Sequence, residues 1–117
     1  MKTILAGDRM GGVFFDIQQE RNRQLQLLRA GKFPFACEDP TVPDAHRLPI
    51  LAEEFGEVSR EVNEQIGREY LLGKETQAAV ETRFASRKRL RAELIQVAAV
   101  AVAWVEGLDD EEEGAER

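Results

Sequence analysis

The chain has 117 residues, of which 43% are hydrophobic and 32% are charged, and its formal net charge is −6. This length allows one domain with a modest hydrophobic core. From Glu106 onward the sequence has seven acids and one base, Arg117. This tail therefore carries the whole net charge, and residues 1–105 are neutral. A neutral body without interleaved aromatic residues argues against a nucleic-acid-binding surface.

The sequence contains one cysteine, Cys37, and one histidine, His46. These are too few for a zinc site or a Cys–His nucleophile. The apolar runs are too short to cross a membrane, and residues 1–12 lack the pattern of a secretory signal. We therefore expect a cytoplasmic protein with reduced thiols and no membrane association.

The first helix is expected over residues 13–30, because Gly31 is a typical residue to end a helix, and residues 1–12 are expected to be flexible. One side of this helix is polar. It is either a solvent face with local ion pairs or a surface that closes over a ligand. The loop that follows holds three of the four prolines, and we expect Phe33 and Phe35 there to pack into the core.

The second helix is predicted from apolar residues that recur at steps of three and four. These residues, which we expect to face the core, are Leu48, Leu51, Phe55, Val58, Val62 and Ile66. Four acids crowd one side of the same helix, at positions 53, 54, 57 and 61. Like charges at such spacings repel by about 0.2–0.5 kcal/mol per pair. The crowding indicates either a solvated acidic face or a site for a divalent cation.

The remaining sequence predicts a short helix near residues 75–84 and a last helix over 87–108, with Ser86 as its cap. Residues 97–105 are apolar on all sides, so this helix must be covered on more than one face. Glu93 projects into that apolar face, with Gln96 beside it. A buried carboxylate needs a partner, which is either an arginine or a metal ion shared with the acids of the second helix.

The segments EEFGEV at 53–58 and RAELIQVAAVAVAWVEGL at 91–108 together resemble the MazG-like branch of the all-α nucleoside triphosphate pyrophosphatases, particularly its small single-domain members. The family pattern is EExxE followed by ExxD. The first motif is complete in this chain, whereas Gln96 stands where the second motif has Asp. The resemblance covers roughly residues 45–108.

The resemblance implies a hydrolase that converts a nucleoside triphosphate to the monophosphate and pyrophosphate. Its cofactor would be Mg²⁺, with Mn²⁺ as an alternative. The metal ligands carried over by position are Glu54, Glu57, Glu93 and Gln96. Glu53, or one of its neighbours, would orient the attacking water as a base. Gln96 brings no charge, which leaves two alternatives: weaker metal binding with retained activity, which we favour, or a retained fold without chemistry.

Similar proteins use their first helix to cover the nucleotide, and a basic run before Glu93 offers countercharge for a triphosphate. The substrate-binding candidates are therefore Glu20, Arg21, Gln24, Lys88 and Arg91.

We expect an all-α fold, a helical bundle of about four helices per chain completed by homo-oligomerisation. The predicted divisions are a flexible N-terminus (1–12), a MazG-like helical domain (13–108) and an acidic disordered tail (109–117). Because one chain has too few helices to cover residues 97–105, the oligomer should be a homodimer or a homotetramer. The alternative to an enzyme is a non-catalytic helical oligomer that binds nucleotides or regulates a partner.

Overall fold

The structure, a computed structural model, describes residues 6–32 and 37–116. Within these ranges the chain forms three helices, α1 (Ala6–Arg29), α2 (Asp44–Leu72) and α3 (Gln77–Glu116), and no strand. The all-α prediction is therefore confirmed. None of these helices combines the length and the apolar character needed to cross a bilayer. Phe33 and Phe35, which we expected to pack, lie outside the described residues.

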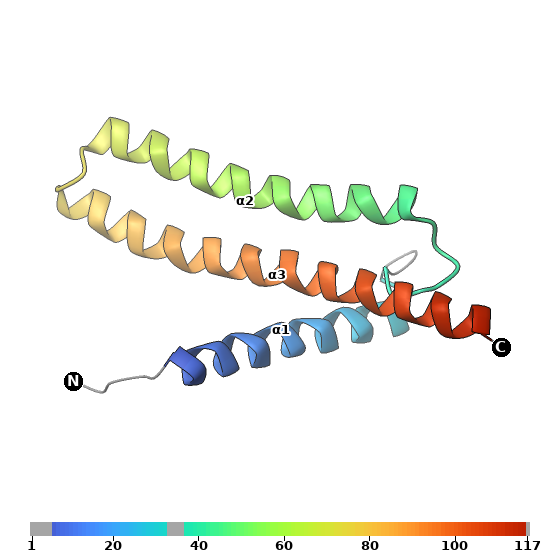
Figure 1. Ribbon diagram of the computed structural model, residues 1–117. Coiled ribbons are helices and arrows are strands. Elements are labelled where there is room, and N and C mark those ends of the chain that lie inside the picture. Colours follow the sequence, from blue (N-terminus) through green and yellow to red (C-terminus); the bar gives the residue numbers. More distant parts are fainter. Residues whose placement is uncertain (1–5, 33–36, 117) are drawn as a thin grey trace.

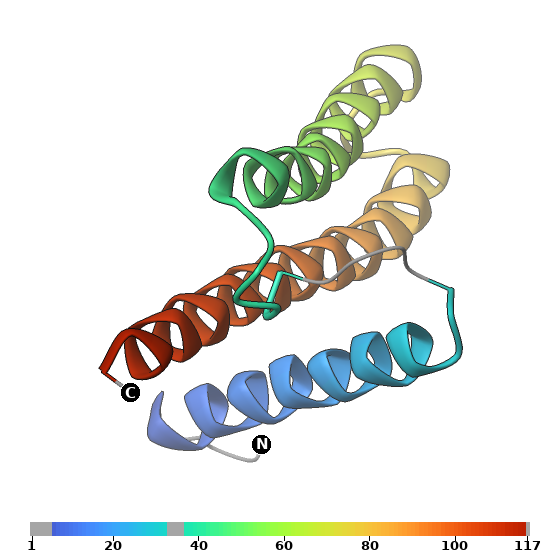
Figure 2. The ribbon, with the colours of Figure 1, turned by 90° about the vertical axis from the view of Figure 1, so that its right-hand side faces the viewer.

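Helix α3 is the central element, with α2 on one side and α1 on the other (Figures 1 and 2). Helices α2 and α3 form an antiparallel hairpin. The hairpin turns at Gly73, whose φ of 77° favours glycine and whose N–H donates to the carbonyl of Glu69 over 2.9 Å. In the described part of the chain α1 and α2 do not approach each other closely, so each is held mainly through α3.

The expected count of about four helices is wrong, because the chain does not break near Ser86 and α3 runs without interruption through residues 77–116. Ser86 is buried inside this helix, and its hydroxyl donates to Glu61 of α2 over 2.9 Å. A serine that bonds another helix in this way is not available to cap its own. The polar residue that suggested a helix start is therefore a contact in the middle of one.

The helix ends also differ from the prediction. Helix α1 begins at Ala6, so residues 6–12 are helical rather than irregular. Helix α3 continues across residues 109–116, which we expected to be disordered. One carboxylate of this acidic stretch, Glu111, accepts a hydrogen bond from Arg47 at the start of α2, over 2.9 Å. A contact with a distant residue thus supports helix where local composition predicted none.

Arg47 is fully buried and ties the connection before α2 to the end of α3. Its Nε donates to the carbonyl of Cys37 over 3.0 Å, and its Nη2 donates to that of Asp39 over 2.8 Å. Gly107 permits this approach, since a Cβ there would lie 2.4 Å from Arg47 Nη2 and 2.5 Å from the Cys37 oxygen. We call this arrangement of Arg47, Gly107 and the two carbonyls the Arg47 latch.

The hydrophobic core formed by the described residues is small. Its central cluster is Cys37, Val100 and Ala103, with Ile50, Leu51 and Trp104 packed against it. The expectation that the whole apolar stripe of α2 is core is wrong. Only Leu51 and Val58 are half-buried, while Leu48, Phe55, Val62 and Ile66 are exposed. Helix α3 covers one flank of α2, and no other described element covers the rest.

The molecule is elongated rather than globular. Its radius of gyration is 18.0 Å, whereas a compact chain of this length has about 13 Å. Large apolar side chains lie exposed on all three helices, among them Phe14, Phe55 and Phe84. Exposed apolar surface of this extent is typical of proteins that associate.

Candidate functional site

Two carboxylates come from the two helices of the hairpin, Glu54 of α2 and Glu93 of α3, and the charge of Glu93 acts on Glu54. We call them the carboxylate pair. Both side chains are half-buried, and each has a buried oxygen, Oε2, without a hydrogen-bond partner among the described residues. A buried carboxylate oxygen without a partner is costly, and the described side chains supply no hydrogen-bond donor for either of these two oxygens.

The electrostatics of the pair agree with this interpretation. Burial raises the pKa of Glu54, and the charges of Glu93 and Glu57 raise it further. Burial likewise raises the pKa of Glu93, followed by repulsion from Glu57 and Glu61. Desolvation and like charge are the two causes that disfavour an ionised carboxylate. Glu57 contributes to both shifts and is itself exposed, so it lies at the solvent side of the pair.

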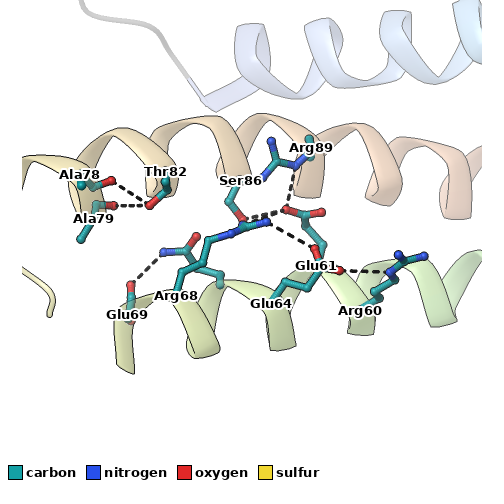
Figure 3. A network of polar contacts seen from close by, with 11 residues as sticks. Arg60, Glu61, Glu64, Arg68, Glu69, Ala78, Ala79, Thr82, Ser86 and Arg89 are labelled. Atoms are coloured by element: carbon teal, nitrogen blue, oxygen red, sulfur yellow. Dashed lines mark hydrogen bonds and ion pairs between the residues drawn. The ribbon is translucent and has the colours of Figure 1, made fainter. Parts of the chain in front are cut away.

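Glu61, further along α2, is in the opposite situation. Its carboxylate accepts hydrogen bonds from Ser86 over 2.9 Å and from Arg89 over 3.0 Å, and Arg68 lies 4.0 Å away (Figure 3). Burial acts to raise the pKa of Glu61, but the hydrogen bonds from Ser86 and Arg89 outweigh it, and the pKa is lowered. Glu61 is therefore a structural acid whose charge is already matched.

The carboxylate pair fits a hard divalent cation only in part. In residues 6–32 and 37–116, no three His, Cys, Asp or Glu side chains gather closely enough to form a metal-binding group. The chemistry of the donors does fit, because Mg²⁺ prefers oxygen ligands and is commonly held by one or two carboxylates together with substrate phosphates and waters. Glu54 and Glu93 meet that smaller requirement.

Gln96 and Glu53 each line a cavity that neither member of the pair lines. Gln96 lines a groove of about 340 Å³ between α1 and α3, together with Gln19, Glu20 and other residues of α1. Glu53 is exposed and lines a separate cavity of about 360 Å³ near the start of α2, beside His46. The structure therefore distributes the residues of the two motifs over three neighbouring surfaces.

The substrate-binding candidates on α1 fall into two groups. Arg21 is buried and donates two hydrogen bonds to Glu106 of α3, the shorter over 2.8 Å, and a third to Gln24 over 2.9 Å. Arg21 thus joins α1 to α3, and Gln24 accepts from it within α1. Glu20 instead lines the groove and accepts hydrogen bonds from Arg23.

The two candidates on α3 also differ. Lys88 lies over the ring of Phe84, with 5.0 Å between its Nζ and the ring centroid. Arg91 lines the groove and donates to Asp16 of α1 over 2.6 Å. Arg91 is therefore placed at a cavity.

Sequence reasoning missed Arg23 as a residue of the groove. It stands three residues after Glu20 and four after Gln19, so a helical wheel places the three on one face. It missed the Arg47 latch as well. The sequence gives no local signal for that contact, since Gly107, which makes room for Arg47, stands far along the chain from it.

We compared the chain with known proteins. No protein-family model matches the sequence, and searches of curated proteins and of solved structures found no significant match. The resemblance to the MazG-like pyrophosphatases therefore rests on the motif residues alone.

Proposed function

We propose that the protein is a metal-dependent nucleoside triphosphate pyrophosphohydrolase of the MazG-like type. The observation that carries the proposal is the carboxylate pair: two acids from two helices, each with a raised pKa and with a buried oxygen that has no partner in residues 6–32 and 37–116. Such a pair is poorly suited to stabilising the fold by itself and well suited to binding a cation. Its residues are also those of the two family motifs.

In the proposed reaction, water attacks the α-phosphorus, the bond to the β-phosphate oxygen breaks, and pyrophosphate leaves. Glu54 and Glu93 would hold Mg²⁺, which when bound neutralises phosphate charge and makes a bound water more acidic. Glu57 is our candidate for the group that takes the proton of the attacking water, because it is exposed and its charge acts on both members of the pair. Glu53 is a less well-placed alternative, since it lines another cavity.

The test is a release assay with Mg²⁺ or Mn²⁺ and a panel of ribo- and deoxyribonucleoside triphosphates, in which pyrophosphate is separated from orthophosphate. We expect pyrophosphate and monophosphate only with metal present and Glu54 intact. A folded protein that turns over none of the nucleotides would contradict the proposal, and it would then point to Gln96 as the mark of lost chemistry.

A second candidate is a non-catalytic helical oligomer, which the exposed apolar stripe of α2 favours. Burying a side chain such as Phe55 or Ile66, now 62% and 60% exposed, contributes about 1.5–3 kcal/mol. We propose that a second copy of the chain covers this stripe, as a homodimer or homotetramer, whether or not the protein is an enzyme. Light scattering that finds a monomer at micromolar concentration would contradict this part of the proposal.

A further inference from the structure

The groove between α1 and α3 holds two arginines from different helices, Arg23 and Arg91. Their side chains are 52% and 56% exposed, so both can be reached by a ligand. Both are also oriented by acids of α1. Arg23 donates through Nε to Glu20 over 2.8 Å, and Arg91 donates through Nη2 to Asp16 over 2.6 Å.

The hydrogen bonds to these acids leave N–H donors of both arginines available. A guanidinium carries five N–H donors. The contacts among the described residues use two nitrogens of Arg23, Nε and Nη2, and one of Arg91, Nη2. Each arginine can therefore bind an anion while it keeps its carboxylate partner. Asp16 and Glu20 then fix the direction of the two guanidinium planes and balance their charge when no anion is bound.

The groove lies within electrostatic reach of Glu54. The charge of Glu20 acts on Glu54, and the charge of Glu54 acts on Arg23. An anion held by Arg23 would thus lie within electrostatic reach of one member of the carboxylate pair. The amide of Gln96 and the side chain of Ile95 complete the α3 wall without adding negative charge.

We propose that Arg23 and Arg91 form a phosphate clamp across this groove, which binds the β- and γ-phosphates of a nucleoside triphosphate, the part that leaves as pyrophosphate. The clamp rests on the proposed function for its choice of ligand. Planar guanidinium groups match phosphate oxygens in pairs, and a polyphosphate offers oxygens to both arginines at once. We therefore expect tripolyphosphate to bind more tightly than orthophosphate.

The test measures binding of inorganic tripolyphosphate to the full chain by titration calorimetry, with and without Mg²⁺. We expect Arg23→Gln and Arg91→Gln each to weaken binding by about tenfold or more, as the loss of a charge-assisted hydrogen bond would. Two exposed arginines outside the groove serve as matched controls. Arg29→Gln changes an exposed arginine of α1, the helix that carries Arg23. Arg60→Gln removes an ion pair within α2, between Arg60 and Glu64, that is similar to the pair of Arg23 with Glu20. Both should change binding by less than about twofold.

A second variant separates binding from helix docking, because Arg91 also links α3 to α1. Asp16→Asn removes that link and leaves the guanidinium in place. The clamp predicts that Asp16→Asn weakens binding less than Arg91→Gln does, because the guanidinium loses an orienting partner but keeps its charge. A loss in Asp16→Asn equal to that in Arg91→Gln would overturn the clamp, since Arg91 would then act by docking α1. So would a wild-type protein that does not bind tripolyphosphate, or arginine variants that bind it as the controls do.

The clamp and the proposed reaction fail in different ways. Glu54→Gln should abolish nucleotide turnover yet leave metal-free tripolyphosphate binding intact or tighter, because one repelling charge is removed. Tight tripolyphosphate binding that needs both arginines, in a protein without turnover, supports the clamp and overturns the reaction. Turnover that needs Glu54, with both arginine variants binding as the wild type does, supports the reaction and overturns the clamp.

Discussion

Two acidic regions of the α2–α3 hairpin contain the same kind of residue in opposite electrostatic states. At Glu61 the carboxylate is matched by Ser86 and Arg89, and its pKa is lowered. At Glu54 and Glu93 a buried oxygen on each residue has no partner within the described chain, and both pKa values are raised. The Glu61 region therefore stabilises the pairing of the helices, whereas the carboxylate pair costs stability and points to a ligand.

The largest expected effect concerns turnover. We expect Glu54→Gln, or Glu93→Gln, to reduce metal-dependent pyrophosphate release by about 100-fold or more, because changing groups even one shell outside a metal costs up to about that factor. Glu64→Gln, an exposed acid on the same helix, is the matched control and should keep activity. Equal activity in all three variants would mean that the carboxylate pair has no catalytic role.

Glu61→Gln should lower the stability of the fold more than Glu54→Gln does, although Glu54→Gln has the larger effect on turnover. Glu61→Gln should lower the free energy of unfolding by about 1–3 kcal/mol, because Ser86 and Arg89 lose a charged acceptor in a partly buried place. Glu54→Gln should leave stability unchanged or raise it, since a repelling charge is removed. Urea denaturation of the two variants makes the comparison directly. If Glu54→Gln proves as destabilising as Glu61→Gln, the contrast between the regions is wrong.

Metal binding should stabilise the folded protein by a smaller amount. A ligand present at about ten times its dissociation constant adds about 1.4 kcal/mol, so Mg²⁺ or Mn²⁺ should raise the melting temperature by a few degrees. The increase should disappear in Glu93→Gln and persist in Glu61→Gln. A thermal shift that is equal in both variants would place the cation elsewhere on the protein.

The smallest effect should be the pH dependence of stability without metal. A carboxyl whose pKa is raised on folding contributes stability that is present below its ordinary value of 4.5 and lost as the pH rises through its folded value. Glu61 has the opposite sign, since its lowered pKa gives stability that is lost as the pH falls below 4.5. We expect Glu54→Gln to flatten the decline toward neutral pH and Glu61→Gln to flatten the decline in acid, each measured by denaturation.

Local patterns predicted the helices well and their contacts poorly. The period of apolar residues indicated α2 and most of α3. It did not indicate that α3 is continuous, because Ser86 is held by Glu61 of another helix. Nor did it show that Phe55 and Ile66 stay exposed, since periodicity defines an apolar face and not the element that covers it.

The candidate site was predictable where it depended on one helix and its direct neighbour. That Glu54 and Glu93 bind the same metal ion stays a prediction, although the charge of Glu93 does act on Glu54. Gln96 was expected beside Glu93, but three residues along a helix fall about 60° short of a full turn, and this turns Gln96 toward α1. Neither motif includes residues of α1, so the motifs do not indicate how α1 packs. For this reason Arg23 was missed and Arg21 was chosen in its place.

Because of the Arg47 latch, the rate at which the Cys37 thiol is alkylated measures movement of the segment before α2. The thiol is 5% exposed, and burial raises its pKa, so it should react with alkylating reagents only when the latch opens. Because Cys37 is the sole cysteine of the sequence, its labelling rate reports one event at one place. Slow labelling in the wild type and fast labelling in Gly107→Ala, where a methyl group would displace Arg47, would show how often this connection lifts away from α3.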